Sequence, residues 1–382
     1  MNDILAAGST RLSNSLAVDD VLSAVNAETN ELTVVFCSAQ RCISEIGDHI
    51  AARWRTGNIV GCSSAAEITP EGYLSGAITA VGFPKRQFHA SIARIDNVRE
   101  FTLAGVTSAV QAIRASLVRK VDSFNPSRCF AILLVDGTVG CEEKLVAALG
   151  TELRGIQLVG GSAAIDWIGQ STNSSSRASV LHNACFRNNC AVLIVMQTDR
   201  PWRIMSHNQF VATKSKAVIT AARPDERLVL EINGSPAAPT YAHLCGMARK
   251  PRASLDFSAH PAMIRMGHQW FPRGILKLNS DDSIQFGCAI ERGLVVAVGK
   301  PVNMFAKLKS AFAEIREQIG PPELIIGFDC AARTVYMNQN GLRPRISKLM
   351  QQNRVVGMST IGEQYNTIHQ SHSFTALAIG NA

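Results

Sequence analysis

Three segments of the chain share one pattern, an apolar run that ends in Gly-x-Ser with a carboxylate four residues after the serine. They are Ile59–Glu67, Leu158–Asp166 and, more loosely, Val355–Glu363. Each follows an earlier apolar run and a segment in which apolar residues recur at helical spacing. A strand–helix–strand unit that recurs within one chain predicts a repeated structural core.

Two pairs of apolar runs extend the pattern beyond the first two copies. Ala77–Phe83 and Phe88–Ile95 are separated by a short polar turn and predict an antiparallel hairpin. Ala178–Asn183 and Cys190–Gln197 predict a second one in the same way. The predicted fold class is therefore α/β in the mixed α+β sense, with repeated strand-helix-strand-hairpin units forming helix-covered mixed sheets in two domains.

The hydrophobic pattern of the sequence changes near Arg223-Pro224-Asp225. Long apolar runs come before this point, and short runs that alternate with polar residues follow it. We expect an irregular N-terminal segment at 1–30, a first domain at 31–223 and a second at 224–382. In the second domain, Pro236–Met247 predicts a helix entered only after Pro239, and Pro301–Ile319 predicts a longer amphipathic helix.

Composition narrows the class of protein. The chain has 382 residues, of which 46% are hydrophobic and 18% charged, which describes a globular protein. No apolar run approaches the roughly 20 residues that span a bilayer, and the N-terminus lacks the basic and apolar regions of a secretory signal. Ten cysteines without a Cys-x-x-Cys pair favour reduced, buried thiols. These features predict a cytoplasmic protein without a membrane span.

The net charge of +8 is spread along the chain, and aromatic residues make up only 6%. Nucleic-acid binding is typical of a longer basic stripe with interleaved aromatic residues. We therefore expect no nucleic-acid partner; the charge excess suits an anionic ligand or an acidic partner equally well.

Several segments, taken in this order, resemble the FIST proteins, a bacterial sensory family with an N-terminal and a C-terminal FIST domain. Those that carry the resemblance are Val60–Glu67, Val229–Ala237, Gly274–Lys277, Asp281–Ile284, Gly327–Arg333 and Ser359–Tyr365. Together they extend over most of the chain from about residue 30 onward. The resemblance implies an intracellular sensor of small ligands that regulates a histidine kinase or a cyclic-di-GMP enzyme.

One subgroup of that family, the NosP-type haem proteins, binds nitric oxide and regulates a histidine kinase. Gly362–Asn366 and His369 are similar to it, whereas Ile361 and Ser371–Ser373 depart from its pattern. Haem-based nitric oxide sensing is thus the leading specific hypothesis. The alternative is a sensor of amino acids or other small metabolites without haem.

The Gly-x-Ser segments supply the first predicted ligand-binding residues. A glycine turn at a strand end presents amide and hydroxyl donors that suit a carboxylate or phosphate. We predict that Ser63, Ser64, Ser162 and Ser359 bind ligand in this way, and that Glu67, Asp166 and Glu363 accept an ammonium or guanidinium group. The structural alternative is a set of tight turns that each pack one sheet.

Cys330 and Arg333 directly follow an apolar strand and are predicted ligand-binding residues as well. A cysteine at a helix N-terminus near arginine is expected to have a lowered pKa, and an arginine can clamp an anion through two hydrogen bonds. A buried thiol and a plain ion pair are the alternatives. Among the histidines, His369 and His243 are the predicted haem-iron ligands, because ligation needs an imidazole facing a cavity.

Catalytic signatures are missing from the sequence. There is no HExxH zinc motif, phosphate-binding P-loop, dinucleotide-binding glycine fingerprint or Gly-x-Ser-x-Gly nucleophile turn. We therefore expect a ligand-binding sensor and not a catalyst. An acyl-transfer or hydrolytic enzyme that uses Ser63 or Cys330 is the remaining alternative.

Overall fold

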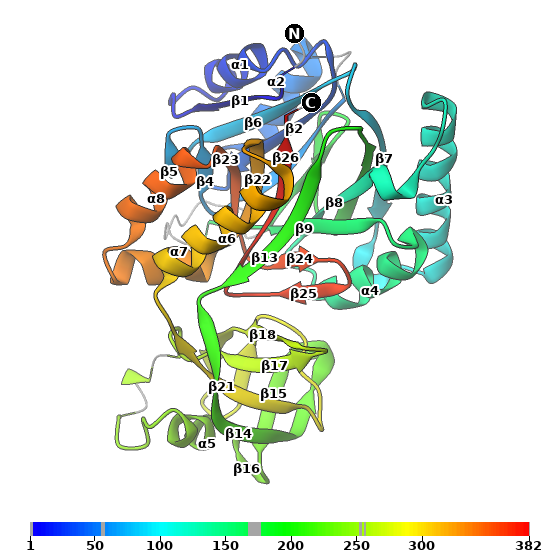
Figure 1. The fold of residues 1–382 in the computed structure, drawn as a ribbon. Coiled ribbons are helices and arrows are strands. Elements are labelled where there is room, and N and C mark those ends of the chain that lie inside the picture. Colours follow the sequence, from blue (N-terminus) through cyan, green and yellow to red (C-terminus); the bar gives the residue numbers. More distant parts are fainter. Residues whose placement is uncertain (1–2, 55–57, 167–176, 252–253, 256, 382) are drawn as a thin grey trace.

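The computed structural model describes residues 3–54, 58–166, 177–251, 254–255 and 257–381. A body made of three equivalent units, here named A, B and C, lies above an inserted β-rich domain in Figure 1. Each unit runs leading strand, helix, strand, helical connection, strand, hairpin and final strand. The predicted fold class, a mixed α/β protein with repeated units, is confirmed.

The elements of each unit follow one another in the same order. Unit A contains β1 (Leu5–Ser9), α1 (Asn14–Ala24), β2 (Asn30–Ser38), α2 (Ile43–Arg53), β3 (Ile59–Ser64), β4 (Glu67–Thr69), β5 (Gly72–Leu74) and β6 (Ile78–Pro84). Unit B contains β7 (His89–Asp96), α3 (Leu103–Lys120), β8 (Cys129–Asp136), α4 (Glu142–Leu153), β9 (Gln157–Ala163), β10 (Val180–His182), β11 (Cys185–Arg187) and β12 (Cys190–Gln197). Unit C contains β13 (Trp202–Asn208), α6 (Met304–Ile319), β22 (Pro322–Cys330), α7 (Ala331–Gln339), α8 (Arg343–Gln352), β23 (Val355–Thr360), β24 (Glu363–Tyr365), β25 (Ile368–Gln370) and β26 (Ser373–Gly380).

The three units exchange their hairpins in a cycle. The three six-stranded sheets have the orders β1-β6-β2-β3-β10-β11, β25-β24-β9-β8-β12-β7 and β13-β26-β22-β23-β4-β5. The hairpin of unit B thus completes the sheet of A, that of C completes the sheet of B, and that of A completes the sheet of C. Each sheet therefore needs a second unit, so the body folds as one piece.

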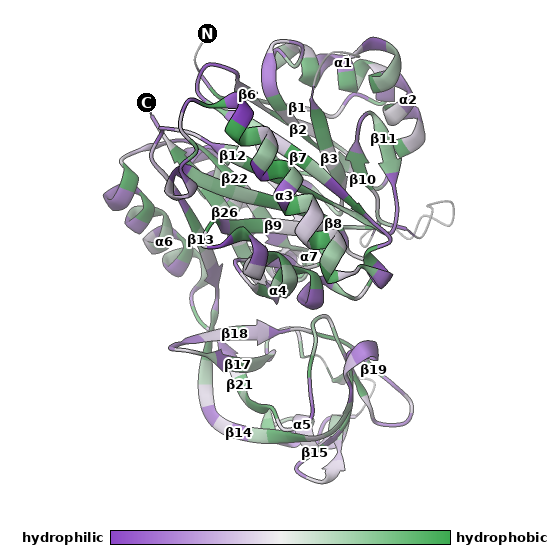
Figure 2. Cartoon of the chain, turned by 90° about the vertical axis from the view of Figure 1, so that its right-hand side faces the viewer, coloured by the Kyte–Doolittle hydropathy of each residue, from purple (hydrophilic) through white to green (hydrophobic). Residues whose placement is uncertain are grey.

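Both faces of each sheet are buried, which explains the continuous apolar runs in the sequence. The inner faces of all three sheets meet in one central core that contains Phe36, Phe130 and Phe328. Each sheet also has one further hydrophobic cluster, which lies between that sheet and its own helices. In Figure 2 the strands of the body are largely green, and the covering helices carry purple on their outward faces.

The glycine of each Gly-x-Ser segment lies where two parallel strands approach closely. Gly61, Gly160 and Gly357 pair with Val35, Leu133 and Gly327. A Cβ atom on these glycines would lie 1.9, 2.0 and 1.8 Å from the carbonyl oxygen of that partner residue. Because no side chain fits at such a distance, the repeated glycine is a requirement of strand pairing in all three units.

The inserted domain interrupts unit C between β13 and α6. It contains β14 (Phe210–Arg223), β15 (Leu228–Ile232), β16 (Ser235–Pro236), α5 (Ala237–Leu244), β17 (Ala262–Met266), β18 (Gln269–Arg273), β19 (Ile275–Leu278), β20 (Ile284–Phe286) and β21 (Val295–Pro301). These strands form an eight-stranded sheet around a separate core. Antiparallel pairing of β14 with β21 brings its two connections to the body together. The predicted division at 223/224 falls at the end of β14 and stays a prediction as a domain boundary.

Both hairpin predictions are wrong, because the strands predicted to pair with each other pair with other strands. β6 lies between β1 and β2, whereas β7 lies at the edge of the unit B sheet beside β12. β10 pairs with β11 and β3, and β12 pairs with β7 and β8. The two strands of each predicted hairpin lie in different sheets. The local pattern of hydrophobic residues predicts strands but does not indicate which strands pair.

Two smaller expectations also differ from the structure. The segment expected to be irregular at 1–30 contributes β1 and the whole of α1 to unit A. The helix α5 begins at Ala237 and includes Pro239 in its first turn, where the missing N–H has no helical partner to lose.

Candidate functional site

The three serines of the Gly-x-Ser segments lie around the centre of the body. Main-chain hydrogen bonds join them in a ring: Ala164 N donates to Ser63 O at 3.0 Å, Ala65 N to Ser359 O at 3.0 Å, and Ile361 N to Ser162 O at 3.4 Å. The donor is in each case two residues beyond the serine of its own unit. The ring therefore ties the three units together at their strand ends.

The serine side chains are bonded within the protein as well. Ser63 Oγ donates to Ala164 O at 2.7 Å and accepts from Ser179 N at 3.0 Å. Gln364 Nε2 donates to Ser162 Oγ at 2.9 Å, and Ser359 Oγ lies 3.4 Å from Thr334 Oγ1. With all three serines at most 1% exposed, the geometry gives them a role in joining the units, and ligand binding by them stays a prediction.

Glu67 and Glu363 hold equivalent positions at the start of their hairpins, and both are buried. Glu67 accepts from Ser64 Oγ at 2.6 Å and from Ala77 N at 2.8 Å. Glu363 accepts from Thr360 Oγ1 and from Ser373 Oγ. Each carboxyl group thus ties the strand before its hairpin to the strand after it. Burial raises the pKa of both carboxyl groups to about 8, against the lowering effect of these hydrogen bonds.

These two pKa values predict that stability falls as pH rises from about 4.5 to about 8. Over that range the folded state keeps two protons that the unfolded carboxyl groups have lost. Each group then lowers the free energy of unfolding by about 1.4 kcal/mol per pH unit. Urea denaturation at several pH values should show this slope, and Glu67→Gln with Glu363→Gln should reduce it. An unchanged slope in the double variant would contradict this assignment, and Glu28→Gln, at an exposed carboxylate, is the control.

Arg333 and Cys330 lie at the start of α7, where Cys330 is the N-cap residue. Arg333 is fully buried, pairs with Asp329 and donates to Gln209 Oε1 at 2.6 Å, while Tyr73 donates to the other oxygen of Asp329. Burial raises the pKa of the Cys330 thiol well above its usual value. The expected lowering of that pKa is therefore wrong, because desolvation and the nearby Glu363 outweigh the main-chain hydrogen bonds of His372 and Ala332, which lower it.

A cavity of about 540 Å³ lies between the body and the inserted domain. The body contributes Glu143, Thr367, Ile368 and His369, and the inserted domain contributes Lys216, Ile264, Arg265, Met266, Trp270, Arg273, Ala289, Glu291, Leu294 and Val295. We call it the interdomain cleft. Two polar side chains of its lining, His369 and Arg273, are only 1% and 5% exposed.

His369 is held on β25 at the inner end of the interdomain cleft. Its Nδ1 lies 3.1 Å from Gln364 Nε2, and its Nε2 makes no hydrogen bond among the described residues. A Cβ atom at Gly362 would lie 2.3 Å from the ring, so the glycine leaves room for the imidazole. Burial lowers the pKa of His369, but nearby Glu143 and Cys288 outweigh that effect and raise it to about 9.

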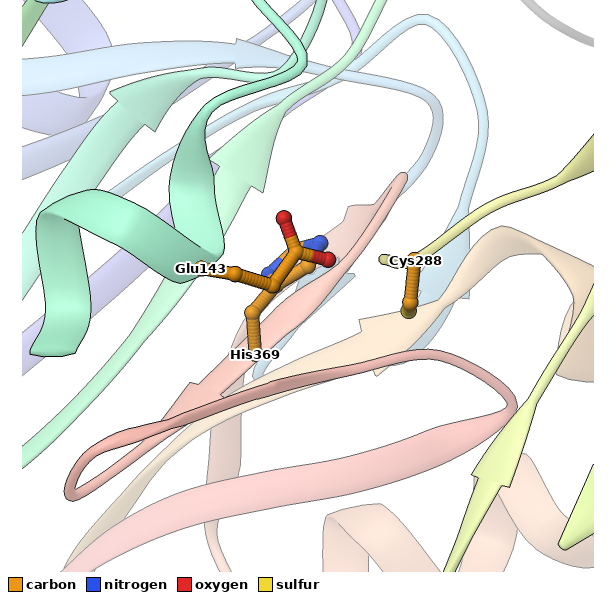
Figure 3. Close-up of side chains that lie close together, drawn as sticks. All are labelled: Glu143, Cys288 and His369. Carbon is orange, nitrogen blue, oxygen red and sulfur yellow. The ribbon is translucent and has the colours of Figure 1, made fainter. Parts of the chain in front are cut away.

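Glu143 faces His369 from the first turn of α4. Its carboxylate accepts from Ala289 N at 2.5 Å and from Arg227 Nη2 at 2.7 Å, both in the inserted domain. Burial raises the pKa of Glu143, yet His369 and Arg227 lower it to about 2. Figure 3 shows Glu143 and His369 side by side with Cys288 next to them. The carboxylate therefore links the two parts of the molecule at the cleft.

Arg273 contributes a second unsatisfied group to the same cleft. Its Nη1 donates to the main-chain oxygen of His369 at 3.0 Å, while its Nε has no partner within the described part of the chain. His243, by contrast, lies on the exposed side of α5 and does not line the cleft. The structure thus brings one of the two predicted histidines to a cavity and leaves the other at the surface.

Sequence reasoning missed Glu143, Cys288 and Arg273 as site residues. Glu143 carried a visible signal, two consecutive acidic residues at a helix start, which a helix dipole alone explains. Cys288 and Arg273 lie in short strands and turns without a recognisable motif. Only the docking of the inserted domain against unit B brings them to His369.

The fold and the interdomain cleft define a class of protein in which a three-unit α/β body and an inserted β domain enclose a small polar cavity. The chain belongs to the FIST family: the FIST N domain matches residues 31–235 and the FIST C domain residues 237–366. The resemblance seen in the sequence is confirmed. FIST domains are generally associated with sensing small ligands in signalling proteins.

Comparison with solved structures adds a remote likeness. A cyanuric acid hydrolase from A. caulinodans aligns over 100% of both chains, with 9% sequence identity and a TM-score of 0.34. A likeness of this level carries no inference about activity. No curated protein sequence matches the chain. Within the described residues, no helix combines the length and hydrophobicity needed to cross a membrane.

Proposed function

We propose that this FIST protein senses a small polar ligand that bears a carboxylate, binds it in the interdomain cleft, and regulates a partner signalling enzyme. One observation carries the proposal. Arg273 and His369 are both buried, both line the cleft, and each has a nitrogen without a hydrogen-bond partner in the described structure. Buried polar groups are normally satisfied, so two unsatisfied nitrogens on residues that line one cavity favour a ligand that supplies the missing partners.

The charges of the cleft favour a ligand with both signs. Lys216, Arg265 and Arg273 supply positive charge from the inserted domain, while Glu143 and Glu291 supply negative charge. Trp270 and neighbouring aliphatic side chains complete the wall. An amino acid or a similar metabolite matches this arrangement, with its carboxylate toward Arg273 and its ammonium group toward an acidic side chain.

The position of the cleft between the body and the inserted domain supports a link between ligand binding and domain arrangement. The inserted domain joins the body through two chain connections and through a small set of polar contacts, among them Arg227 with Glu142 and Glu143. A ligand that binds the closed cleft more tightly than an open one shifts the population toward the closed form. We propose that a cytoplasmic histidine kinase or cyclic-di-GMP enzyme reads this shift, and that the chain acts by binding and not by catalysis.

Substitution of Arg273 tests the proposal. We expect one of the twenty amino acids or a small dicarboxylate to raise the melting temperature of the full chain and to quench Trp270 fluorescence. Arg273→Gln should weaken binding by about 10- to 100-fold, since a charged hydrogen bond contributes about 1.5–3 kcal/mol. Isothermal titration calorimetry measures the loss, and Arg292→Gln, at an exposed arginine outside the cleft, should leave affinity unchanged. Equal affinity in wild type and Arg273→Gln would contradict the proposal.

Haem-based nitric oxide sensing is the second candidate, and the partnerless Nε2 of His369 is the observation that favours it. Glu143 and Cys288, however, lie close to the ring nitrogens of His369, with the ligand atoms of all three residues within 4.8 Å of one another. The described arrangement does not fit a haem unless both side chains move away, and we derive no step through haem. A Soret band that shifts with nitric oxide, in protein purified with haem supplied, would support this candidate over the polar ligand.

A further inference from the structure

Three side chains from separate segments converge beside the interdomain cleft, which two of them line. Glu143 comes from the first turn of α4, Cys288 follows β20 in the inserted domain, and His369 lies on β25. Each offers one ligand atom, and these oxygen, sulfur and nitrogen atoms all lie within 4.8 Å of one another (Figure 3). In the part of the chain that the structure describes, this is the one such group of three.

We infer that Glu143, Cys288 and His369 form a binding site for a divalent metal ion of the zinc class. Imidazole nitrogen, thiolate sulfur and carboxylate oxygen are the ligands that Zn²⁺ takes in proteins, whereas Mg²⁺ and Ca²⁺ prefer oxygen alone. Zinc bonds of about 2.0–2.3 Å place tetrahedral ligand atoms about 3.3–3.6 Å apart. The three ligand atoms therefore need to approach one another by at most about 1.5 Å.

Neighbouring groups already orient these ligands, as is usual around metal-binding histidines. Gln364 lies against Nδ1 of His369, and its Oε1 has no partner within the described residues. Turning the carboxamide by 180° lets Oε1 accept from Nδ1–H and from the hydroxyl of Ser162 together. This arrangement fixes the tautomer that leaves Nε2 with a lone pair for the metal ion.

The carboxylate of Glu143 is oriented by the inserted domain. One oxygen accepts from Ala289 N and the other from Arg227. Because each carboxylate oxygen has two lone pairs, these bonds leave room for a metal ion. Glu143 and His369 line the cleft, so the fourth position of the ion faces the cavity and is open to water or to a ligand group.

The metal ion would also join the two parts of the molecule. Cys288 belongs to the inserted domain, whereas Glu143 and His369 belong to the body, so coordination clamps the domain onto the body. The site does not require the proposed cleft ligand. Failure to bind a metal ion would therefore not count against binding of the cleft ligand. Failure to bind the cleft ligand would likewise not count against the metal site.

Cobalt binding tests the site, because Co²⁺ replaces Zn²⁺ and reports thiolate coordination by a charge-transfer absorption band. The protein is the full chain without a histidine tag, carrying Cys42→Ser and Cys185→Ser to remove its two exposed thiols. We expect one equivalent of Co²⁺ with a charge-transfer band, displacement by Zn²⁺ and no displacement by Mg²⁺. Cys288→Ser should abolish the band, and Gln364→Ala should weaken binding by about 10- to 100-fold.

The half-buried thiol Cys245, which lies outside the group of three, supplies the matched control. Cys245→Ser should keep the band, and circular dichroism checks that each variant is folded. If Cys288→Ser does not fold, Glu143→Gln provides the second variant, with at least tenfold weaker binding expected. The inference is overturned if the parent protein shows no charge-transfer band, if Cys288→Ser keeps it, or if Glu143→Gln binds Co²⁺ as tightly as the parent.

Discussion

Gly357→Ala is expected to destabilise the protein by about 3 kcal/mol or more, at or beyond the upper end of the usual cost of overpacking. The new Cβ would lie 1.8 Å from the carbonyl oxygen of Gly327 on the paired strand. The main chains of β22 and β23 must separate to remove this clash, because the new Cβ meets a main-chain atom and not a side chain that could rotate away. Urea denaturation followed by far-UV circular dichroism measures the effect, together with the yield of folded protein.

Gly61→Ala and Gly160→Ala should behave in the same way, because the three glycines hold equivalent positions. Gly287→Ala is the control: its Cβ would meet the nearest atom at 3.4 Å, an ordinary contact, and stability should change by less than about 1 kcal/mol. A Gly357→Ala variant as stable as Gly287→Ala would show that the close approach of the parallel strands is not required.

Arg333→Met should lower the free energy of unfolding by about 3–5 kcal/mol, since it leaves Asp329 buried without its charged partner. Both residues are fully buried, and burial already raises the pKa of Asp329 against the opposing effect of Arg333. Urea denaturation at neutral pH measures the loss. The double variant Asp329→Asn with Arg333→Met should recover part of it, because both charges are then removed.

The surface pair Arg128–Asp199 provides the comparison for this ion pair. Both of its side chains are more than half exposed, and Arg128→Met should change stability by less than about 1 kcal/mol. If Arg128→Met and Arg333→Met lower the free energy of unfolding equally, the buried ion pair stabilises the protein no more than a surface pair does. A double variant less stable than Arg333→Met alone would instead indicate that packing, and not the lone charge, dominates.

The repeat was readable from the sequence because each copy satisfies the same physical requirement. Gly61, Gly160 and Gly357 are glycine for one reason, the close approach of paired parallel strands, so the pattern survives in all three units. The exchange of hairpins was not readable. β4, β10 and β24 are three-residue strands whose sequences carry no sign of the sheet that they join, and only tertiary packing determines the partner.

The interdomain cleft was predictable only through His369, which the family resemblance singled out. Its surroundings come from the start of α4 and from the inserted domain, neither of which is close to it in sequence. Arg273 and Cys288 lie in short strands and turns, where a single arginine or cysteine without a motif does not predict a binding site. Their contribution exists only once the inserted domain docks against unit B, so no local pattern could indicate it.

The most direct test of ligand sensing is a crystal structure of the full chain with the amino acid or dicarboxylate that gives the largest thermal shift. We predict ligand density in the interdomain cleft, with a carboxylate within hydrogen-bond distance of Arg273 and the ligand beside Trp270 and His369. Density at another site, with the interdomain cleft holding only solvent, would contradict the proposed function.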